Sequence, residues 1–437
     1  MRLAITIRNL SSAQHARTGR RRVTPSLPDI TRVFARIGLL SFGGPAAQIA
    51  LMHRELVEQR PWLSEKQFLN ALSFCMLLPG PEAMQLATYS GWRLHGLVGG
   101  LIAGLLFVVP GALLILALAA SYAWLGAVPL VAALFLGIKA TVVVIVLEAL
   151  LKVSRKALHG LDRWVIAGLS FVGIFAFAAP FPLIIASAAV YGALKGGQIS
   201  ADAPPLAKAR TLRTILVWGG LWWTPVAVSW LAGATRLTEI GLFFSKLAVV
   251  TFGGAYAVLA YMTQTVVQDY GWLSTPQMMD GLGLAETTPG PLILVTEFVG
   301  YLAGYGAGGI GLGIAAAVLT VWVTFVPSFL WIFAGAPYID WISTRPRLTG
   351  ALSAITAAVV GVILNLSLWF ATHVFFAVVG TLDFGPATLL APDPATLDLR
   401  ALILAIAAAI MLLYLKWSLP RVLLLAALAG IGLASLG

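Results

Sequence analysis

The chain has 437 residues, of which 59% are hydrophobic and only 10% are charged. Its mean hydropathy of +0.93 implies more apolar surface than one soluble core can bury, which excludes an ordinary soluble domain. The formal net charge is +11, but most Lys and Arg residues lie in short loops between apolar runs, where they set membrane orientation. We therefore expect a polytopic protein in the lipid bilayer that binds no nucleic acid.

Residues 1–30 form a basic tail with six arginines and no acidic residue before Asp29. This pattern is compatible with a cytoplasmic tail or with an organellar transit peptide, and we favour a cytoplasmic N-terminus. The tail has no short apolar core followed by a small-residue cleavage site, so we expect no cleaved secretory signal.

Thirteen apolar elements follow, and their Leu-, Ala- and Gly-rich composition favours membrane helices over the strands of a β-barrel. The predicted fold class is an all-α polytopic membrane protein. In chain order the elements lie at about 31–57, 67–91, 97–122, 130–151, 164–179, 183–194, 214–231, 242–267, 277–302, 307–334, 348–376, 401–415 and 422–436. The predicted divisions are a first transporter repeat (31–163), a connector with about three membrane helices (164–240), a second repeat (241–378), and a loop with two C-terminal membrane helices (379–437).

The two repeats carry the same sequence pattern. Residues 34–81 align without a gap onto residues 244–291 at a constant offset of 210, and one third of the aligned positions are identical. The identical positions include Phe42-Gly43-Gly44 with Phe252-Gly253-Gly254, and Pro79-Gly80-Pro81 with Pro289-Gly290-Pro291. A duplicated membrane segment that Gly and Pro interrupt at matching places is typical of secondary transporters.

The repeats are predicted to have inverted topology, because four elements and three connecting ones, an odd number, precede the second repeat. Loop charge points the same way, since an excess of Lys and Arg marks cytoplasmic loops. Arg54, Arg60 and Lys66 lie in the loop before residue 67, whereas the matching loop before residue 277 has neither Lys nor Arg.

Two arrangements are open for the first two elements of each repeat. If the N-terminus and the basic loops of the first repeat are all cytoplasmic, each element is a re-entrant hairpin broken at Gly43-Gly44-Pro45 or at Pro79-Gly80-Pro81. Half-helices of roughly 10–13 residues extend about 15–20 Å, too short to span the bilayer. The alternative is a continuous but kinked span.

Each Gly/Pro break is a candidate anion site. Proline suits the first turn of a helix, and the preceding glycine lets the backbone turn sharply. The new helix N-terminus exposes unpaired N–H groups and the positive end of a dipole, which favour a compact oxyanion. Gly and Pro also permit close helix packing, but four breaks at repeat-matched positions favour a substrate site near a pseudo-twofold axis.

Polar residues beside the breaks complete the predicted site. Arg36 and Lys246 match, and such a cation attracts substrate, pairs with a carboxylate, or snorkels to a headgroup. Ser41 and Thr251 also match, as donors to substrate or as hydroxyls bonded back to their own helices. The predicted substrate-binding residues are Arg36, Ser41, Gly43, Gly44, Pro45, Gln85, Lys246, Thr251, Gly253, Gly254, Thr287, Thr288 and Gly290.

Three glutamates, Glu82, Glu286 and Glu297, lie in or beside the Pro-Gly-Pro elements. They are candidates for coupling proton movement to anion movement, because a carboxylate repels a neighbouring anion unless it is protonated. For Glu82, which follows Pro81, the alternative is that it stabilises the start of its helix. The predicted structural breaks are Pro79, Gly80, Pro81, Pro289 and Pro291.

Motifs of other functional classes do not occur in the sequence. It has no GxxxxGK[ST] loop, so we do not expect an ATP-driven pump. It has no HExxH motif and no Cys/His cluster, so we expect neither a metal site nor a cofactor. Without a Ser/His or paired-Asp arrangement we do not expect an enzyme.

Several motifs together resemble a known family, the long-chain, two-domain members of the chromate ion transporters. The resemblance extends from residue 34 to the C-terminus. It is carried by Phe34-Ala35-Arg36-Ile37-Gly38, Ser41-Phe42-Gly43-Gly44-Pro45, Leu78-Pro79-Gly80-Pro81-Glu82, Phe107-Val108-Val109-Pro110-Gly111, Thr251-Phe252-Gly253-Gly254-Ala255-Tyr256 and Gly283-Leu284-Ala285-Glu286-Thr287-Thr288-Pro289-Gly290-Pro291.

The resemblance implies a secondary carrier that exports chromate across the bacterial cytoplasmic membrane and confers chromate resistance, with sulfate as a competitor and protons as a candidate coupling ion. Short members carry one domain each and work in pairs, in line with the duplication; a homo-oligomer of this chain is compatible with the sequence. The alternative is a sulfate or other oxyanion transporter of the same architecture. Two positions depart from the family, Gln48 where His is frequent and Glu297 where Gln is expected.

Overall fold

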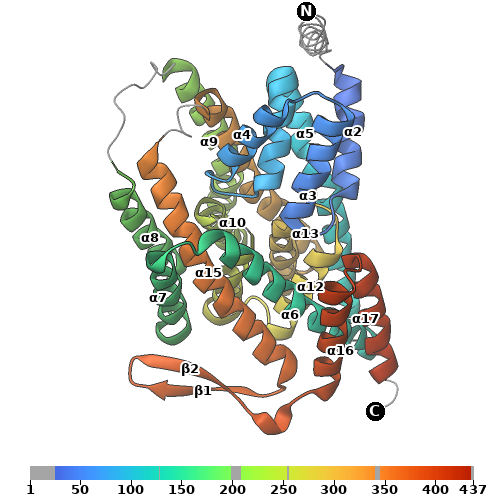
Figure 1. The fold of residues 1–437 in the computed structure, drawn as a ribbon. Helices are drawn as coiled ribbons and strands as arrows, with labels where there is room; N and C mark the ends of the chain where they lie inside the picture. Colours follow the sequence, from blue (N-terminus) through green and yellow to red (C-terminus); the bar gives the residue numbers. More distant parts are fainter. Residues whose placement is uncertain (1–24, 127, 198–207, 253–254, 340–344, 435–437) are drawn as a thin grey trace, which may run out of the picture.

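The structure is a computed structural model that describes residues 25–126, 128–197, 208–252, 255–339 and 345–434. Residues 1–24 of the basic tail and the predicted site residues Gly253 and Gly254 lie outside the described residues. Helices make up nearly all of the described chain (Figure 1), as the composition predicts.

The thirteen predicted apolar elements are all present, as single helices or as pairs of half-helices. The first repeat holds α2 (Leu27–Leu40), α3 (Gly44–His53), η1 (Arg54–Gln59), α4 (Glu65–Cys75), α5 (Glu82–Leu125) and α6 (Pro129–Ala157). The connector holds α7 (Leu161–Phe177), α8 (Phe181–Lys195) and α9 (Lys208–Leu231). The second repeat holds α10 (Thr235–Val250), α11 (Ala255–Gln264), η2 (Thr265–Asp269), α12 (Thr275–Thr287), η3 (Leu292–Leu294), α13 (Val295–Gly335), η4 (Ala336–Tyr338) and α15 (Pro346–Phe375). The chain then forms β1 (Val379–Phe384), β2 (Ala387–Pro392), η5 (Pro394–Thr396), α16 (Leu399–Ala409), η6 (Ile410–Tyr414) and α17 (Leu419–Ala434).

The described residues include five helical stretches that are long and apolar enough to cross a membrane, so the chain is a multi-pass membrane protein. They are Glu82–Leu125, Pro129–Ala157, Thr211–Leu231, Leu292–Tyr338 and Pro346–Phe375.

α5 is a helical hairpin rather than one straight helix. Its backbone leaves the helical region at His95 and Gly96, where Gly96 has a φ of +58°. Gly91 packs directly on Gly99 across this turn, with no room for a side chain. α13 turns in the same way at Gly308-Gly309. The predicted boundary between the second and third elements of each repeat therefore falls at a tight turn.

The first two elements of the first repeat return to the end of the molecule where they begin. His95, in the turn of α5, lies against the backbone of Pro25 just before α2 (Nε2 to O, 2.5 Å). His53, at the end of α3, contacts Glu65 at the start of α4. In Figure 1, α4 and the start of α2 lie toward the same end. Each of these two elements therefore folds back on itself as a hairpin, as the re-entrant interpretation predicts.

The second repeat points the other way. In Figure 1, α4 lies toward the end where the described chain begins, whereas its counterpart α12 lies toward the end with the β-hairpin and the C-terminus. This arrangement agrees with the inverted topology that loop charge predicts.

The loop predicted after the second repeat contains a β-hairpin. β1 and β2 pair antiparallel, with Phe384 opposite Ala387, and Gly385 makes the turn at a φ of +63°. β1 is exposed along almost its whole length, so it lacks the alternation of apolar and polar residues that marks a half-buried strand. For this reason the sequence predicts a loop here and no strands.

Small residues let α17 pack tightly on α6. A Cβ on Gly137 would overlap the backbone of Ala426, and a Cβ on Gly430 would overlap the backbone of Ala133. Close backbone approach of this kind is a common way for helices to associate in membranes.

We expect Gly137→Ala to destabilise the protein, because the added methyl group forces α6 and α17 apart at a cost of about 1–3 kcal/mol. The matched variant is Gly168→Ala in α7, where nothing lies within 4 Å of the added Cβ. Unfolding temperature in detergent measures both. Equal effects of the two substitutions would contradict this packing role.

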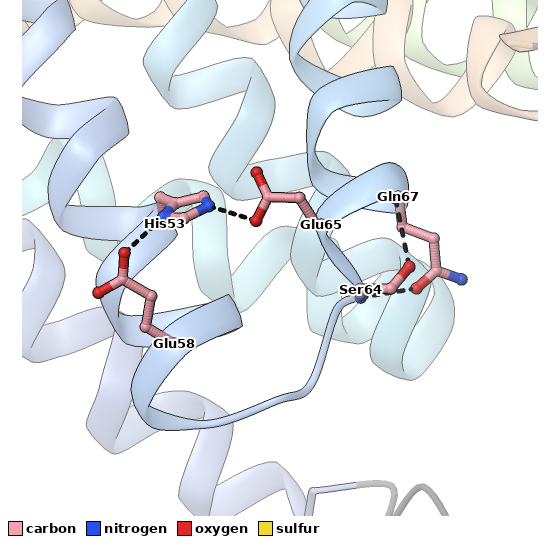
Figure 2. Close-up of polar contacts among 5 residues, drawn as sticks. All are labelled: His53, Glu58, Ser64, Glu65 and Gln67. Atoms are coloured by element: carbon pink, nitrogen blue, oxygen red, sulfur yellow. Dashed lines mark hydrogen bonds and ion pairs between the residues drawn. The ribbon is translucent and has the colours of Figure 1, made fainter. Parts of the chain in front are cut away.

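His53, at the end of α3, links η1 and the start of α4 through two glutamates (Figure 2). His53 Nδ1 lies 3.1 Å from Glu58 and Nε2 lies 2.8 Å from Glu65, while Ser64 and Gln67 form a capping box at the start of α4. His53 lies outside the five candidate spans. The hydrogen bond to Glu65 raises the pKa of His53 above its usual 6.5; partial burial opposes this, and the charges of Glu65 and Glu58 reinforce it.

This raised pKa predicts a pH-dependent stability. Because the folded state holds the His53 proton more tightly than the unfolded state, the stabilisation is complete below about pH 6.5 and is lost as the pH rises through the raised pKa. Unfolding temperatures of wild type and His53→Gln across this range test it. We expect the advantage of the wild type to shrink at alkaline pH; an advantage that grows with pH would show that the sign is wrong.

Candidate functional site

Four helix starts, two from each repeat, surround one small cavity. α3 and α11 contribute Pro45 and Ala255 at matching positions, and α5 and η3 begin beside the matching Pro81 and Pro291. The full lining is Pro45, Gln48, Pro81, Glu82, Ala83, Thr251, Ala255, Pro291, Leu292 and Ile293. The structure thus brings together three of the predicted breaks and the described residues Thr251 and Ala255 that flank the fourth. We call this space the central cavity; its volume is about 10 Å³, roughly the space of one water molecule, so it is closed to a larger ion.

The two repeats hold each other at the breaks through a reciprocal pair of backbone hydrogen bonds. Gly80 N–H donates to the carbonyl of Thr251 at 2.8 Å, and Gly290 N–H donates to the carbonyl of Ser41 at 2.9 Å. Gly290 is the counterpart of Gly80, and Ser41 is the counterpart of Thr251, so the second bond repeats the first with the two repeats exchanged. The breaks are therefore related by a local pseudo-twofold axis.

The glycines of the breaks have conformations that other residues rarely adopt. Gly43 and Gly44 have φ values of +85° and +76°, and Gly80 and Gly290 have φ values of +117° and +98°. A Cβ on Gly80 would also lie 2.8 Å from the side chain of Ser328. Both the turns and the close approach of the repeats therefore require glycine.

The predicted hydroxyl donors are occupied within their own helices. Ser41 Oγ donates to the carbonyl of Ile37, and Thr251 Oγ1 to that of Leu247, each at 2.6 Å. Thr287 and Thr288 likewise bond back into α12. Of the two interpretations, the structure shows back-bonding, so the donors left for an anion are the free N–H groups of the helix starts.

Two buried glutamines bond to the breaks. Gln48 Nε2 donates across the repeats to the carbonyl of Gly290, at 2.7 Å, and within its own repeat to that of Ser41, at 3.3 Å. Gln85 Nε2 donates to the carbonyl of Pro79 in its own repeat at 2.7 Å and lies 3.5 Å from Ser328 Oγ in the second repeat. The counterpart of Gln48 in the second repeat is Val258. The two sides of the pseudo-twofold contact are therefore unequal.

Neither predicted cation lines the central cavity. Arg36 lies 3.7 Å from the buried carboxylate of Glu55, which also pairs with Arg60. Lys246 lies in a separate cavity, with its Nζ 5.5 Å from the centre of the Tyr261 ring. For Arg36, the pairing with a carboxylate that we considered is what the structure shows.

Of the three candidate glutamates, only Glu82 lines the central cavity. It occupies the first position of α5, and its counterpart in the second repeat is the apolar Leu292. Glu286 accepts a hydrogen bond from the Tyr256 hydroxyl at 2.9 Å. Glu297 is buried in α13, and its Oε2 has no partner among the described residues. Glu82 is thus the one candidate glutamate that borders the meeting point of the breaks.

The sequence analysis did not predict a buried ion pair between the repeats. Lys139 Nζ in α6 lies 3.1 Å from Asp280 in α12, and the Tyr122 hydroxyl donates to Asp280 at 2.7 Å. Both charges lie within apolar stretches of sequence, which is a signal of pairing. Spacing along one helix cannot reveal a partner on another helix, so the pair is visible only in the fold.

We expect Gln48→Leu to weaken the contact between the repeats, because it removes the amide that donates to the buried carbonyl of Gly290. The cost of such an unpaired group is about 1–3 kcal/mol. Met262→Leu, a volume-conserving change at a buried position of α11, is the control and should cost less than about 1.5 kcal/mol. Unfolding temperature in detergent compares them, and an equal loss in both would rule out the hydrogen-bonding role.

Comparison with known proteins identifies the family. The model of the chromate transporter family matches residues 28–193 and 238–431, and each matched segment contains one pair of breaks. The probable chromate transport protein of Synechococcus elongatus is 31% identical over 77% of this chain and 83% of that protein. The chromate transport proteins of Cupriavidus metallidurans and Pseudomonas aeruginosa are 30% and 34% identical, over 78% and 77% of this chain and 81% and 79% of their own lengths. No solved structure matches. The chain belongs to the chromate transporter family.

Proposed function

We propose that this protein is a secondary transporter that exports chromate across the bacterial cytoplasmic membrane and thereby confers chromate resistance. The observation that carries the proposal is the meeting of four helix starts, two from each inverted repeat, at the central cavity. The choice of chromate as substrate rests on the relatives from Cupriavidus metallidurans and Pseudomonas aeruginosa, both named chromate transport proteins.

The charge of the helix starts suits a dianion. Each helix N-terminus carries an effective charge of roughly +0.5, so four of them present roughly +2 to an ion between them. The ten lining residues include no Lys or Arg. The site therefore holds chromate by backbone N–H groups and dipoles, with the glycines at 43, 44, 80 and 290 setting the turns.

The cavity must open for transport to occur, since its present volume of about 10 Å³ holds little more than a water molecule. In an inverted-repeat transporter, rocking of one repeat against the other opens the site to either side in turn. The reciprocal contacts between Gly80 and Thr251 and between Gly290 and Ser41 lie at the boundary between the repeats. We propose that they separate and re-form during this movement.

Glu82 is the proposed proton-coupling residue. An ionised carboxylate in the cavity would cancel about half of the helix-dipole charge and repel the dianion. Chromate therefore binds with Glu82 protonated, so one proton accompanies each dianion. Orientation follows from loop charge: the N-terminus and the end of the molecule near α4 face the cytoplasm.

Chromate uptake into inside-out vesicles, at equal expression of each variant, tests the proposal. We expect saturable wild-type uptake that rises as the pH on the cytoplasmic side falls. Glu82→Gln should lose most of this pH dependence, and Gly44→Val should lose uptake because a branched residue cannot adopt its φ of +76° without strain.

Asp383→Asn, which removes a carboxylate on the exposed β-hairpin far from the cavity lining, is the control and should behave as the wild type. Equal pH dependence in Glu82→Gln and wild type would remove Glu82 from the coupling step. Absence of chromate uptake, or full displacement by equimolar sulfate, would favour a sulfate or other oxyanion transporter.

A further inference from the structure

A cluster of charges in the first repeat has no equivalent in the second. The buried carboxylate of Glu55, whose side chain is 0% exposed, lies between Arg36 and Arg60. The repeat offset places Lys246, Thr265 and Tyr270 at the three matching positions. The second repeat therefore keeps a cation but has a threonine where the first repeat has the carboxylate.

In the second repeat, a cavity lies beside Thr265, the counterpart of Glu55. Lys246, Thr265 and Tyr270 all line one cavity of about 610 Å³, many times the volume of the central cavity, and they share it with Tyr261, Gln264 and Gln268. We call it the Lys246 cavity. Among the described residues, no carboxylate lies within ion-pair distance of the Lys246 ammonium group. The cation and several polar side chains thus face an open space.

We propose that the Lys246 cavity binds a compact oxyanion in the position that corresponds to the Glu55 carboxylate of the first repeat. An oxyanion presents to a cation the same oxygen atoms that a carboxylate presents, and it accepts hydrogen bonds from an ammonium group, amides and hydroxyls. Lys246 supplies the charge, Gln264 and Gln268 supply amide groups, and Thr265 and Tyr270 supply hydroxyls. The cavity thus contains a donor set of the required chemistry.

This site is separate from the central cavity and lies at one end of the protein. The two cavities share no lining residue. The Lys246 cavity does share Gln264 and Gln268 with a neighbouring cavity of about 210 Å³ bounded by Thr381 and Thr388 of the β-hairpin. The hairpin lies at the end away from the N-terminus in Figure 1. The oxyanion therefore enters the Lys246 cavity from the hairpin side, the outer side in the proposed orientation.

Asp269, which also lines the cavity, opposes the binding of an anion. Its counterpart in the first repeat is the uncharged Gln59. The Asp269 charge is therefore expected to lower the affinity of the site for an anion, and removal of this charge should raise the affinity. This gives the proposal a variant that improves binding, which a general loss of folding cannot imitate.

Sulfate binding to the purified full-length protein in a neutral detergent tests the site, because sulfate is a compact oxyanion that does not oxidise the protein. We expect Lys246→Gln and Thr265→Glu each to weaken sulfate binding by about tenfold or more, the size of one lost charged hydrogen bond. Lys246→Arg should retain binding, and Asp269→Asn should strengthen it severalfold. Binding that is unchanged in Lys246→Gln and Thr265→Glu would overturn the proposal.

Glu55→Thr, the matched change in the first repeat, tests the equivalence of the two clusters. It leaves Arg36 and Arg60 without their carboxylate and should lower the unfolding temperature. If an oxyanion takes the place of the carboxylate, sulfate should raise the unfolding temperature of Glu55→Thr more than that of the wild type. An equal sulfate effect on both proteins would contradict the equivalence.

Lipid phosphate is the other source of the same chemistry. Sulfate titrations in nanodiscs with and without phosphatidylglycerol separate the two sources, because binding of a free anion should not depend on anionic lipid. Full competition by phosphatidylglycerol would assign the site to a headgroup and overturn the proposal of a free oxyanion.

The inference rests on the proposed function for the choice of oxyanion and for the side from which it enters, and the two fail separately. Sulfate binding that depends on Lys246 in a protein without chromate uptake would support the site and contradict the function. Normal chromate uptake with sulfate binding that is independent of Lys246 would support the function and contradict the site.

Discussion

The structure depends on two backbone hydrogen bonds, from Gly80 to Thr251 and from Gly290 to Ser41. Irregular backbone at membrane depth is tolerated only where protein buries it, because lipid offers no partner to its N–H and C=O groups. At each Pro-Gly-Pro turn the glycine N–H finds its acceptor in the other repeat, at the residue two positions before the Gly-Gly pair. Each repeat therefore supplies an acceptor that the broken helix of the other repeat uses.

On this symmetric framework the side chains differ between the repeats. Gln48 adds hydrogen bonds on one side of the contact where Val258 offers none, and Glu82 faces the central cavity opposite the apolar Leu292. In the proposed rocking mechanism, symmetry of the backbone would make the inward-open and outward-open forms close in energy. Differences in side chains can then give the two forms different affinities for ions and protons, and such a difference is what a ligand needs in order to shift a conformational equilibrium.

Much of this architecture could be predicted from the sequence, because long apolar runs and matched Gly/Pro breaks are local signals. The four breaks and the boundaries of the membrane elements are of this kind. The partners of polar side chains are not: Ser41 and Thr251 bond back to their helices, Lys139 pairs with Asp280 on another helix, and Arg36 is neutralised by Glu55. The two ion pairs depend on how separate helices are brought together. The hydroxyls of Ser41 and Thr251 bond within one helical turn, but the sequence alone leaves donation to a substrate equally open. The β-hairpin was not predicted for another reason, since β1 is almost fully exposed and β2 only partly buried, so neither strand imposes an alternating pattern.

The electrostatics of the central cavity also bear on the direction of transport. Moving one charge through a membrane potential is worth about 2.3 kcal/mol per 100 mV, so a dianion leaving a cell with a negative interior gains about 4.6 kcal/mol at that potential. If Glu82 carries a proton with each dianion, the net charge moved falls from two to one and the gain halves. In the proposed export direction, movement is downhill in the electrical potential in either case, which is compatible with the lack of an ATP-binding loop in the sequence. Under the role proposed for Glu82, protonation of a single carboxylate at the start of α5 would determine how many charges leave the cell with each anion.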